Sequence, residues 1–196
     1  MIDFLEQVDT SITLWINGLH LPFLDKFMWA ISAKVTWIPY YLFILYLVFK
    51  RYSPKVFLLF FALVLVSVGL SDFVSSQIIK ETVQRYRPSH NLNIQHLLHL
   101  YQFKDGAIYR GGQFGFVSSH SANFFAIATF TYLTLKQSIK NCGYWLFGIA
   151  ILVALSRIYL GVHYLSDIII GGLIGSLIAF FVYRFIFKRI IQLVHN

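Results

Sequence analysis

Two histidines, one aspartate and three cationic side chains of this chain lie at or beside the ends of long apolar stretches. His163 and Asp167 are four residues apart, which places both side chains on one face if this segment is helical. The Asp167 carboxylate then accepts a hydrogen bond from one imidazole nitrogen, and the other nitrogen of His163 is free to act as a nucleophile. His120 has no carboxylate at helical spacing, and we expect it to be the general acid that protonates a leaving alkoxide.

The cationic side chains indicate what these groups act on. Arginine guanidinium groups match the tetrahedral oxygens of a phosphate. The backbone N–H groups at the start of the apolar stretch 120–135 add a helix N-terminus, which is an anion site in its own right. Because these cations already neutralise a phosphate, we expect the reaction to need neither a metal nor another cofactor. The predicted phosphate-binding cations are Lys80, Arg87 and Arg157.

The rest of the sequence indicates a membrane protein. Of its 196 residues, 58% are hydrophobic and 12% are charged, about half the charged fraction usual in soluble domains. The net charge of +8 does not point to nucleic acid, because the cations lie between long apolar runs. Since helices satisfy their own backbone polar groups in lipid, we expect an all-α membrane bundle that forms one domain over residues 1–196. Its roughly five spans, each close to the 20 apolar residues that a bilayer requires, are 27–49, 56–79, 120–135, 144–162 and 164–187.

The first 22 residues differ from the spans. Apolar residues recur with helical spacing from Ile2 to Leu19, whereas Asp3, Glu6 and Asp9 fall off that face. We expect residues 1–22 to form an amphipathic helix that lies in the membrane interface. The alternative is a helix docked on the bundle, and the three acids argue against a sixth span.

Charge beside the spans indicates their orientation. If five spans alternate, three basic clusters fall on one side of the membrane, and no acidic residue lies among them. The positive-inside rule makes that side cytoplasmic, so the catalytic candidates and the loop 81–119 face away from the cytoplasm. We therefore expect a multi-pass protein of the inner cell membrane with an extracytoplasmic site. The basic residues are Lys50, Arg51, Lys55, Lys136, Lys140, Arg184, Lys188 and Arg189.

Three short motifs resemble the signature of the type 2 phosphatidic acid phosphatase family. They match it in order, in internal spacing and in their places at the ends of spans, and the resemblance extends over about residues 56–187. It implies a phosphohistidine intermediate on His163, a relay carboxylate at Asp167, a general acid at His120, and phosphate contacts from Lys80, Arg87, Ser118 and Arg157. The motifs are Lys80-(six residues)-Arg87-Pro88, Ser118-Ser119-His120, and Ser156-Arg157-(five residues)-His163-(three residues)-Asp167.

The second motif departs from the family pattern at one position. The family usually has Pro-Ser-Gly-His, whereas this chain has Val117-Ser118-Ser119-His120. Glycine lets the backbone approach a phosphate closely, and Ser119 offers the same backbone N–H with a small side chain. We therefore include Ser119 among the predicted phosphate-binding residues and interpret the change as variation within the family.

Together these features predict an enzyme that hydrolyses a phosphomonoester or diphosphate of a membrane lipid. The candidate substrates are a polyprenyl diphosphate, a phosphorylated glycerolipid and a lipid A phosphate. The long loop 81–119 is basic and aromatic, so we expect it to cap the site and bind a polar headgroup, which favours lipid A. The alternatives are a mobile surface loop and, for the whole protein, a non-enzymatic lipid-phosphate binder or translocator.

Three further features lead to structural expectations. Asp72 lies inside an apolar stretch, where we expect it to pair with a buried cation. Gly171 and Gly175 are four residues apart in another stretch, which favours close helix packing within the bundle over dimerisation. A metal site among the loop histidines is conceivable, but no cysteine or carboxylate cluster accompanies them. These histidines are His90, His96 and His99.

Overall fold

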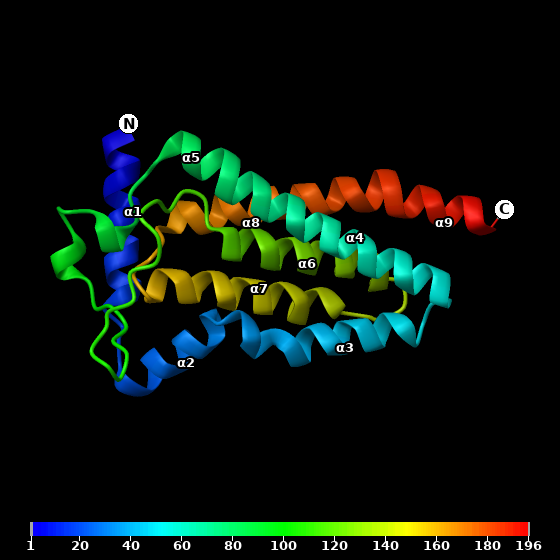
Figure 1. Cartoon of the computed structure of the whole chain (residues 1–196), viewed down its shortest axis with the longest axis horizontal. Helices are drawn as coiled ribbons and strands as arrows, with labels where there is room; N and C mark the ends of the chain where they lie inside the picture. The colour runs from blue at the N-terminus through cyan, green and yellow to red at the C-terminus, as the bar shows by residue number, and fades with distance from the viewer. Residues whose placement is uncertain (1, 196) are drawn as a thin grey trace.

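The computed structural model describes residues 2–195, and Met1 and Asn196 lie outside the described residues. The long helices run side by side along one axis, and α1 crosses one end of the bundle (Figure 1). No strand of a sheet occurs among the described residues, so the predicted all-α class is confirmed. The helices are α1 (Ile2–Asn17), α2 (Pro22–Ser32), α3 (Ile38–Phe49), α4 (Pro54–Phe73), α5 (Lys80–Val83), α6 (Ser119–Leu135), α7 (Cys142–Tyr159), α8 (Leu165–Val182) and α9 (Lys188–His195).

Several of these helices are parts of longer helical segments. A π-helical segment at Val74–Ile79 joins α4 to α5, and another at Tyr183–Phe187 joins α8 to α9. Between Ser32 and Lys34 the chain instead bends by 70°, and a 3₁₀ turn, Lys34–Trp37, leads from this bend into α3. The predicted span 27–49 is therefore broken near its start, and the break brings Ser32 and Lys34 to the site described below.

The number of spans agrees only roughly with the prediction of about five. Three helical segments within residues 2–195 are long and apolar enough to cross a membrane, namely Pro54–Val83, Cys142–Tyr159 and Leu165–Leu193. The bent pair α2–α3 makes a fourth if it counts as one span. The fifth expected span, α6, has 17 residues. It lies inside the bundle against α4, α7 and α8, so it has less need of a lipid-facing surface.

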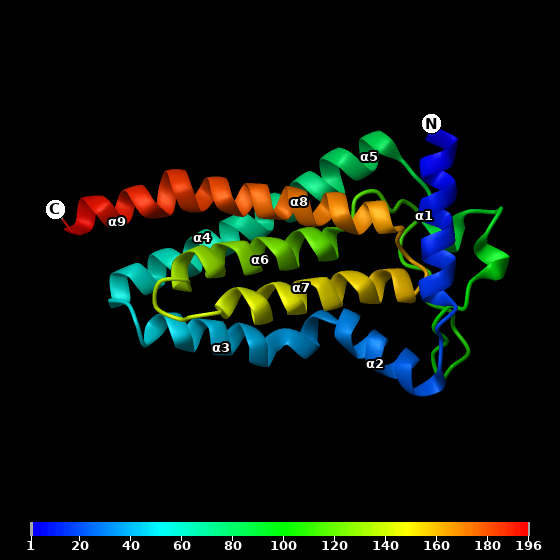
Figure 2. The same ribbon diagram turned by 180° about the vertical axis from the view of Figure 1, so that it is seen from behind.

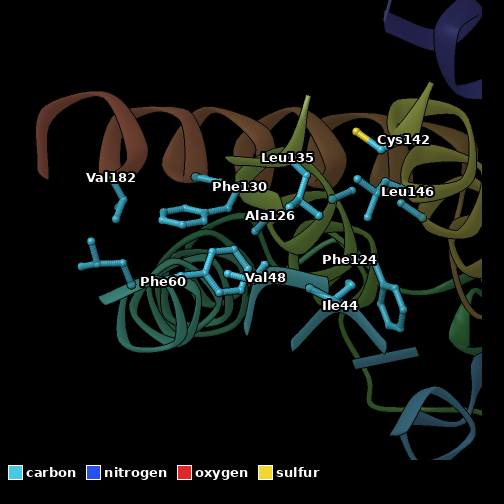
Figure 3. Packing of buried hydrophobic residues seen from close by; sticks show 14 of the residues in the cluster. Ile44, Val48, Phe60, Phe124, Ala126, Phe130, Leu135, Cys142, Leu146 and Val182 are labelled. Atoms are coloured by element: carbon cyan, nitrogen blue, oxygen red, sulfur yellow. The ribbon is translucent and has the colours of Figure 1, made fainter. Parts of the chain in front are cut away.

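The core lies between α3, α4, α6, α7 and α8. Phe60 of α4, Phe130 of α6 and Val182 of α8 approach one another there (Figure 3). The rings of Phe60 and Phe130 meet edge to face at 5.7 Å between centroids, an arrangement that aromatic pairs prefer. This core fixes α6, whose first turn carries His120.

Close contact between α6 and α8 also fixes the site. A Cβ atom on Gly175 would lie 1.9 Å from the Ala122 carbonyl oxygen, and one on Gly171 would lie 2.6 Å from the Ser118 carbonyl oxygen. The expected role of these glycines in packing within the bundle is therefore confirmed. Because the two helices touch at backbone distance, the N-terminal ends of α6 and α8 lie next to each other.

Replacing Gly175 by alanine is expected to destabilise the bundle. The added methyl group overlaps the α6 backbone, and overpacking of this kind typically costs about 1–3 kcal/mol. Thermal unfolding in detergent, followed by tryptophan fluorescence, measures the effect. Gly148→Ala on α7 is the matched control, because its Cβ atom meets nothing within 4 Å. Equal behaviour of the two variants would contradict a tight α6–α8 contact.

Helix α1 packs on the bundle through a polar stripe. Asp9, Thr13 and Asn17 are buried, whereas apolar residues such as Val8 and Trp15 are exposed. Asn17 Nδ2 donates to the carbonyl oxygens of Tyr159 and His99, each at 2.7 Å. Figure 2 shows α1 lying across the end of the bundle, and the docked alternative therefore describes its contacts. The exposed apolar side of α1 leaves the interfacial placement a prediction. Of the residues in the predicted pattern, the side chains of Ile2, Asp3 and Leu5 lie outside the description.

Candidate active site

A cavity of about 210 Å³ lies at the end of the bundle that α1 crosses. Four helices, α4, α5, α6 and α7, contribute to its walls. The bend after α2, the loop after α5 and the connection between α7 and α8 complete them. The convergence expected from counting spans is therefore present in the structure. The predicted site residues that line this cavity are Lys80, Arg87, Ser119, His120, Arg157 and His163.

His163 lies in the connection between α7 and α8 and is 1% exposed. Its Nδ1 is 3.1 Å from Asp167 Oδ2, and its Nε2 is 3.2 Å from Arg87 Nη1. A carboxylate only accepts and a guanidinium only donates, so these partners assign the proton to Nδ1 and a lone pair to Nε2. Burial and the nearby Arg87 hold the pKa of His163 well below its ordinary value, so the ring is neutral at physiological pH. Nε2 thus carries the lone pair of the ring, and in this structure that lone pair accepts from Arg87.

Asp167 is the third residue of α8 and is fully buried. Its Oδ2 also accepts from the backbone N–H of Tyr164 at 3.0 Å, as a residue at this position does in a capping box. The backbone carbonyl of Asp167 accepts from Ser118 N–H at 3.0 Å. Asp167 therefore caps the first turn of α8, orients His163 and holds the N-terminal end of α6.

Arg87 is held by backbone carbonyl groups as well as by His163. Its Nε donates to Phe114 at 3.0 Å, and its Nη1 donates to Val162 at 3.3 Å. Burial and the neighbouring Arg157 lower the pKa of Arg87 to about 10, so it stays cationic at neutral pH. These bonds fix the guanidinium before any phosphate is present, and such preorganised charge is the form that stabilises a transition state best.

Arg157, near the end of α7, connects three parts of the fold. Its Nη1 donates to Ser32 Oγ at the bend after α2, and its Nη2 donates to the Tyr109 hydroxyl in the loop at 2.8 Å. Arg157 itself is 2% exposed, and its Nε atom has no partner within the described residues. An unpaired buried N–H beside a cationic cavity is suited to an anion.

The residues of the second motif, Ser118-Ser119-His120, have two different roles. Ser119 and His120 line the cavity. Ser118, expected to contact phosphate, is not among the lining residues and instead caps α6, where its Oγ accepts from Ser121 N–H at 3.4 Å. A serine at this position satisfies a free N–H group of the first helical turn. Its phosphate contact stays a prediction.

One expectation about a polar residue needs correction. Asp72 lines the cavity, but its Oδ1 accepts from Asn123 Nδ2 at 2.9 Å, and none of the ion pairs within residues 2–195 involves it. The partner is thus an amide on α6, and no spacing between Asp72 and Asn123 indicated it. The three loop histidines form no metal cluster in the described chain. His99 instead pairs with Asp25 at 2.9 Å.

Arg85, which lies in the basic loop 81–119, contacts the site but is not among the predicted site residues. It reaches Asp167 Oδ1 at 3.2 Å and Asp9 Oδ2 at 2.8 Å. Spacing could have revealed it: Arg85 and Arg87 lie in an extended segment, where residues two apart point to the same side. Between them, Tyr86 points outward and is 51% exposed.

An apolar groove of about 350 Å³ adjoins the polar cavity. It runs between α3, α4 and α6 and is lined by residues such as Ile44, Phe61 and Val64. Lys34, His120 and Asn123 line both spaces, so the groove and the cavity meet at these three side chains. A molecule with a charged end and an apolar chain fits this pair of spaces.

The loop after α5 covers the cavity through Tyr109, Gly111 and Gly112. The expectation that the loop caps the site is therefore supported, whereas its binding of a headgroup stays a prediction. Gly111 has a positive φ of 68°, and a Cβ atom there would lie 2.7 Å from Arg87 Nη1. Glycine is needed for both reasons.

Replacing Gly111 by alanine is expected to lower phosphate release by about 10–100-fold, the range seen when a catalytic group is misplaced by about 1 Å. The added methyl group displaces the Arg87 guanidinium from His163. Steady-state rates measure the effect, with Gly106→Ala as control. Gly106 also has a positive φ, 87°, but its Cβ atom would meet only the end of a flexible side chain at 4.0 Å. Equal losses would assign the effect to backbone strain alone.

The chain is similar to known proteins along most of its length. Residues 57–191 match the model of the PAP2 superfamily. Over 184 residues the chain is 34% identical to the lipid A 4′-phosphatase of Porphyromonas gingivalis, and this match covers 93% of this chain and 75% of that protein. Over 181 residues it is 35% identical to the lipid A 4′-phosphatase of Bacteroides thetaiotaomicron, and this match covers 90% of this chain and 76% of that protein. Among solved structures, a transmembrane PAP2-type phosphatidylglycerolphosphate phosphatase from Bacillus subtilis has a TM-score of 0.67 at 23% identity, over 92% of this chain and 85% of that one.

Proposed function

The chain belongs to the PAP2 superfamily and is a membrane lipid phosphatase, and we propose that its substrate is a phosphorylated glycolipid of the lipid A kind. The junction of the polar cavity with the apolar groove is the observation that carries this proposal. The cavity takes the phosphate among Lys80, Arg87 and Arg157, while the groove takes part of an acyl chain. The two relatives at 34% and 35% identity, both named lipid A 4′-phosphatases, support the 4′-phosphate as the group removed.

The first chemical step transfers the phosphoryl group to His163. When Arg87 donates to the bound phosphate instead of to His163, the Nε2 lone pair attacks phosphorus, the P–O bond to the lipid breaks, and its electron pair goes to the leaving oxygen. His120, on the cavity wall, takes up a proton when the negative phosphate binds beside it, and it gives this proton to the leaving oxygen. The positive charge that develops on the His163 ring lies against Asp167 Oδ2, 3.1 Å from Nδ1. The cations of the cavity stabilise the negative charge of the transition state.

The second step returns the enzyme to its starting state. His120, now neutral, takes a proton from a water molecule whose oxygen attacks phosphorus. The P–N bond breaks, its electron pair returns to Nε2, and inorganic phosphate leaves. In this cycle His120 transfers the protons, Asp167 stabilises the positive ring and the cations stabilise the phosphoryl oxygens. No metal is needed for these tasks, so we expect phosphate release to persist in excess chelator.

The charge distribution supports a site on the extracytoplasmic face of the inner membrane. The connection between α3 and α4, the connection between α6 and α7, and α9 all lie at the end away from α1 (Figure 1). Those segments carry the basic clusters, including Arg51, Lys140 and Arg189. By the positive-inside rule that end is cytoplasmic, and the cavity lies at the opposite end.

A substrate panel tests the proposal. Purified protein in detergent, with excess chelator, is given lipid A bisphosphate, phosphatidylglycerophosphate, phosphatidate or undecaprenyl diphosphate. Released phosphate is measured, and mass spectrometry locates the phosphate lost from lipid A. We expect the highest kcat/KM on lipid A, with loss at the 4′ position.

Each other outcome contradicts a different part of the proposal. A higher kcat/KM on another lipid overturns the glycolipid substrate and leaves the phosphatase. Loss of activity in chelator overturns the metal-free cycle. No turnover on any lipid, combined with binding of lipid phosphate, favours the non-enzymatic binder or translocator.

A further inference from the structure

Helix α1 reaches the catalytic aspartate through one buried carboxylate. Asp9 is 7% exposed, although it belongs to a helix on the outer end of the bundle. Its Oδ1 accepts from Ser166 N–H at 2.9 Å, and its Oδ2 accepts from Ser166 Oγ at 2.5 Å and from Arg85 Nη2 at 2.8 Å. The family match begins at residue 57, so Asp9 lies outside it. Burying a carboxylate is costly unless it is paired and hydrogen-bonded, and these three donors, one of them the Arg85 cation, offset that cost.

Arg85 is shared between Asp9 and Asp167. Its Nη2 donates to Asp9, whereas its Nη1 donates to Asp167 Oδ1 at 3.2 Å and to Ser166 Oγ at 2.7 Å. The guanidinium lies over the Tyr164 ring, 3.9 Å from its centroid. Asp167 thus uses Oδ1 for Arg85 and keeps Oδ2 for His163.

We propose that Asp9 and Arg85 are positioning residues for the His163–Asp167 pair, and that α1 is thereby part of the catalytic apparatus. The proposal rests on the role of His163 as nucleophile. Asp9 holds one side of the guanidinium, which prevents Arg85 from forming a two-pronged pair with Asp167 and drawing the carboxylate away from His163.

Charge leads to the same conclusion. The group of Asp9, Arg85 and Asp167 carries a net charge of about −1 with both carboxylates ionised, which stabilises the positive charge that forms on His163. Removing the Asp9 charge leaves this group neutral. The loss is greatest when the ring carries the phosphoryl group, so it falls on kcat and spares substrate binding.

Asp9→Asn is the first test variant, since its amide oxygen still accepts from Ser166 N–H while its charge is lost. Asn17 continues to hold α1 on the bundle. We expect kcat to fall by about 10–100-fold, the usual effect of losing a group that orients a catalytic residue, with KM changed less than about twofold. Glu6→Gln removes the same charge from the exposed side of α1 and is expected to leave kcat unchanged. Arg85→Lys, which leaves α1 intact, is expected to lower kcat in the same range.

A double-mutant cycle separates positioning from simple stabilisation. If Asp9 acts through Asp167, adding Asp9→Asn to Asp167→Asn lowers kcat less than about twofold further. A wild-type kcat in Asp9→Asn or Arg85→Lys overturns the proposal, and so does an equal factor in both backgrounds. An inactive wild-type protein contradicts the proposed function instead, so the two failures are distinguishable.

Discussion

Replacing His163 by glutamine is expected to abolish lipid phosphate release, with a loss on the order of 10⁴–10⁶-fold, as when the nucleophile of a covalent enzyme is removed. Glutamine keeps a polar side chain of similar length, but no neutral lone pair comparable to that of Nε2. His163 is suited to attack because burial and Arg87 hold its pKa well below the ordinary value, which keeps the ring unprotonated. Asp167 at 3.1 Å holds the proton on the other nitrogen.

Trapping of the intermediate shows whether the loss is chemical. Protein mixed with ³²P-labelled lipid and quenched in alkali is expected to retain label, because phosphohistidine is stable in alkali and labile in acid. The label should be absent in His163→Gln. His96→Gln, an exposed histidine of the loop, is the control and should keep both label and activity. Full activity of His163→Gln, or label on another residue, would remove His163 as the nucleophile.

The low pKa of His163 also determines how the stability of the fold changes with pH. Because the folded state binds this proton less readily than the unfolded chain, protonation favours unfolding. Stability from this residue is therefore complete above the ordinary histidine pKa, about 6.5, and decreases as the pH falls below it.

Most of the cavity was predictable from the sequence because its residues lie at the ends of apolar stretches. Lys80, His120 and Arg157 are far apart in the chain, but alternating helices bring such ends together. Each of these residues belongs to one of the three motifs, and the spacing inside that motif identified it. The helical class was predictable for a related reason, since the apolar runs leave lipid-facing backbone with no other way to pair.

The parts that escaped prediction depend on contacts between segments without a local pattern. The sequence left open whether α1 lies in the membrane interface or docks on the bundle, and its apolar pattern did not indicate that a polar stripe around Asp9 makes the contact. The partners that decide this, Arg85 and Ser166, lie more than 70 residues away along the chain. The bend between Ser32 and Lys34 is another case, because the apolar pattern of the sequence is the same whether the helix is straight or broken.

Replacing His120 by asparagine is expected to lower kcat/KM for a lipid phosphomonoester by about 10²–10⁴-fold, the usual contribution of a general acid. The lipid leaves its phosphate as an alkoxide, a strong base that needs a proton as the P–O bond breaks. The p-nitrophenolate that leaves p-nitrophenyl phosphate, an aryl phosphate, is a much weaker base. Its kcat/KM, which reports the first chemical step, should therefore fall far less in the same variant.

The second step distinguishes a general acid from a phosphate-binding group. His120 also takes the proton of the attacking water, so in His120→Asn the phosphoenzyme should form quickly from the aryl phosphate and break down slowly. A burst of p-nitrophenolate, followed by a slow steady rate and accumulation of labelled His163, is the expected time course. Equal losses of kcat/KM on both substrates without a burst would mean that His120 only binds phosphate. The position of His120 where the cavity meets the apolar groove favours the first result, because the bond that breaks joins the phosphate to the lipid.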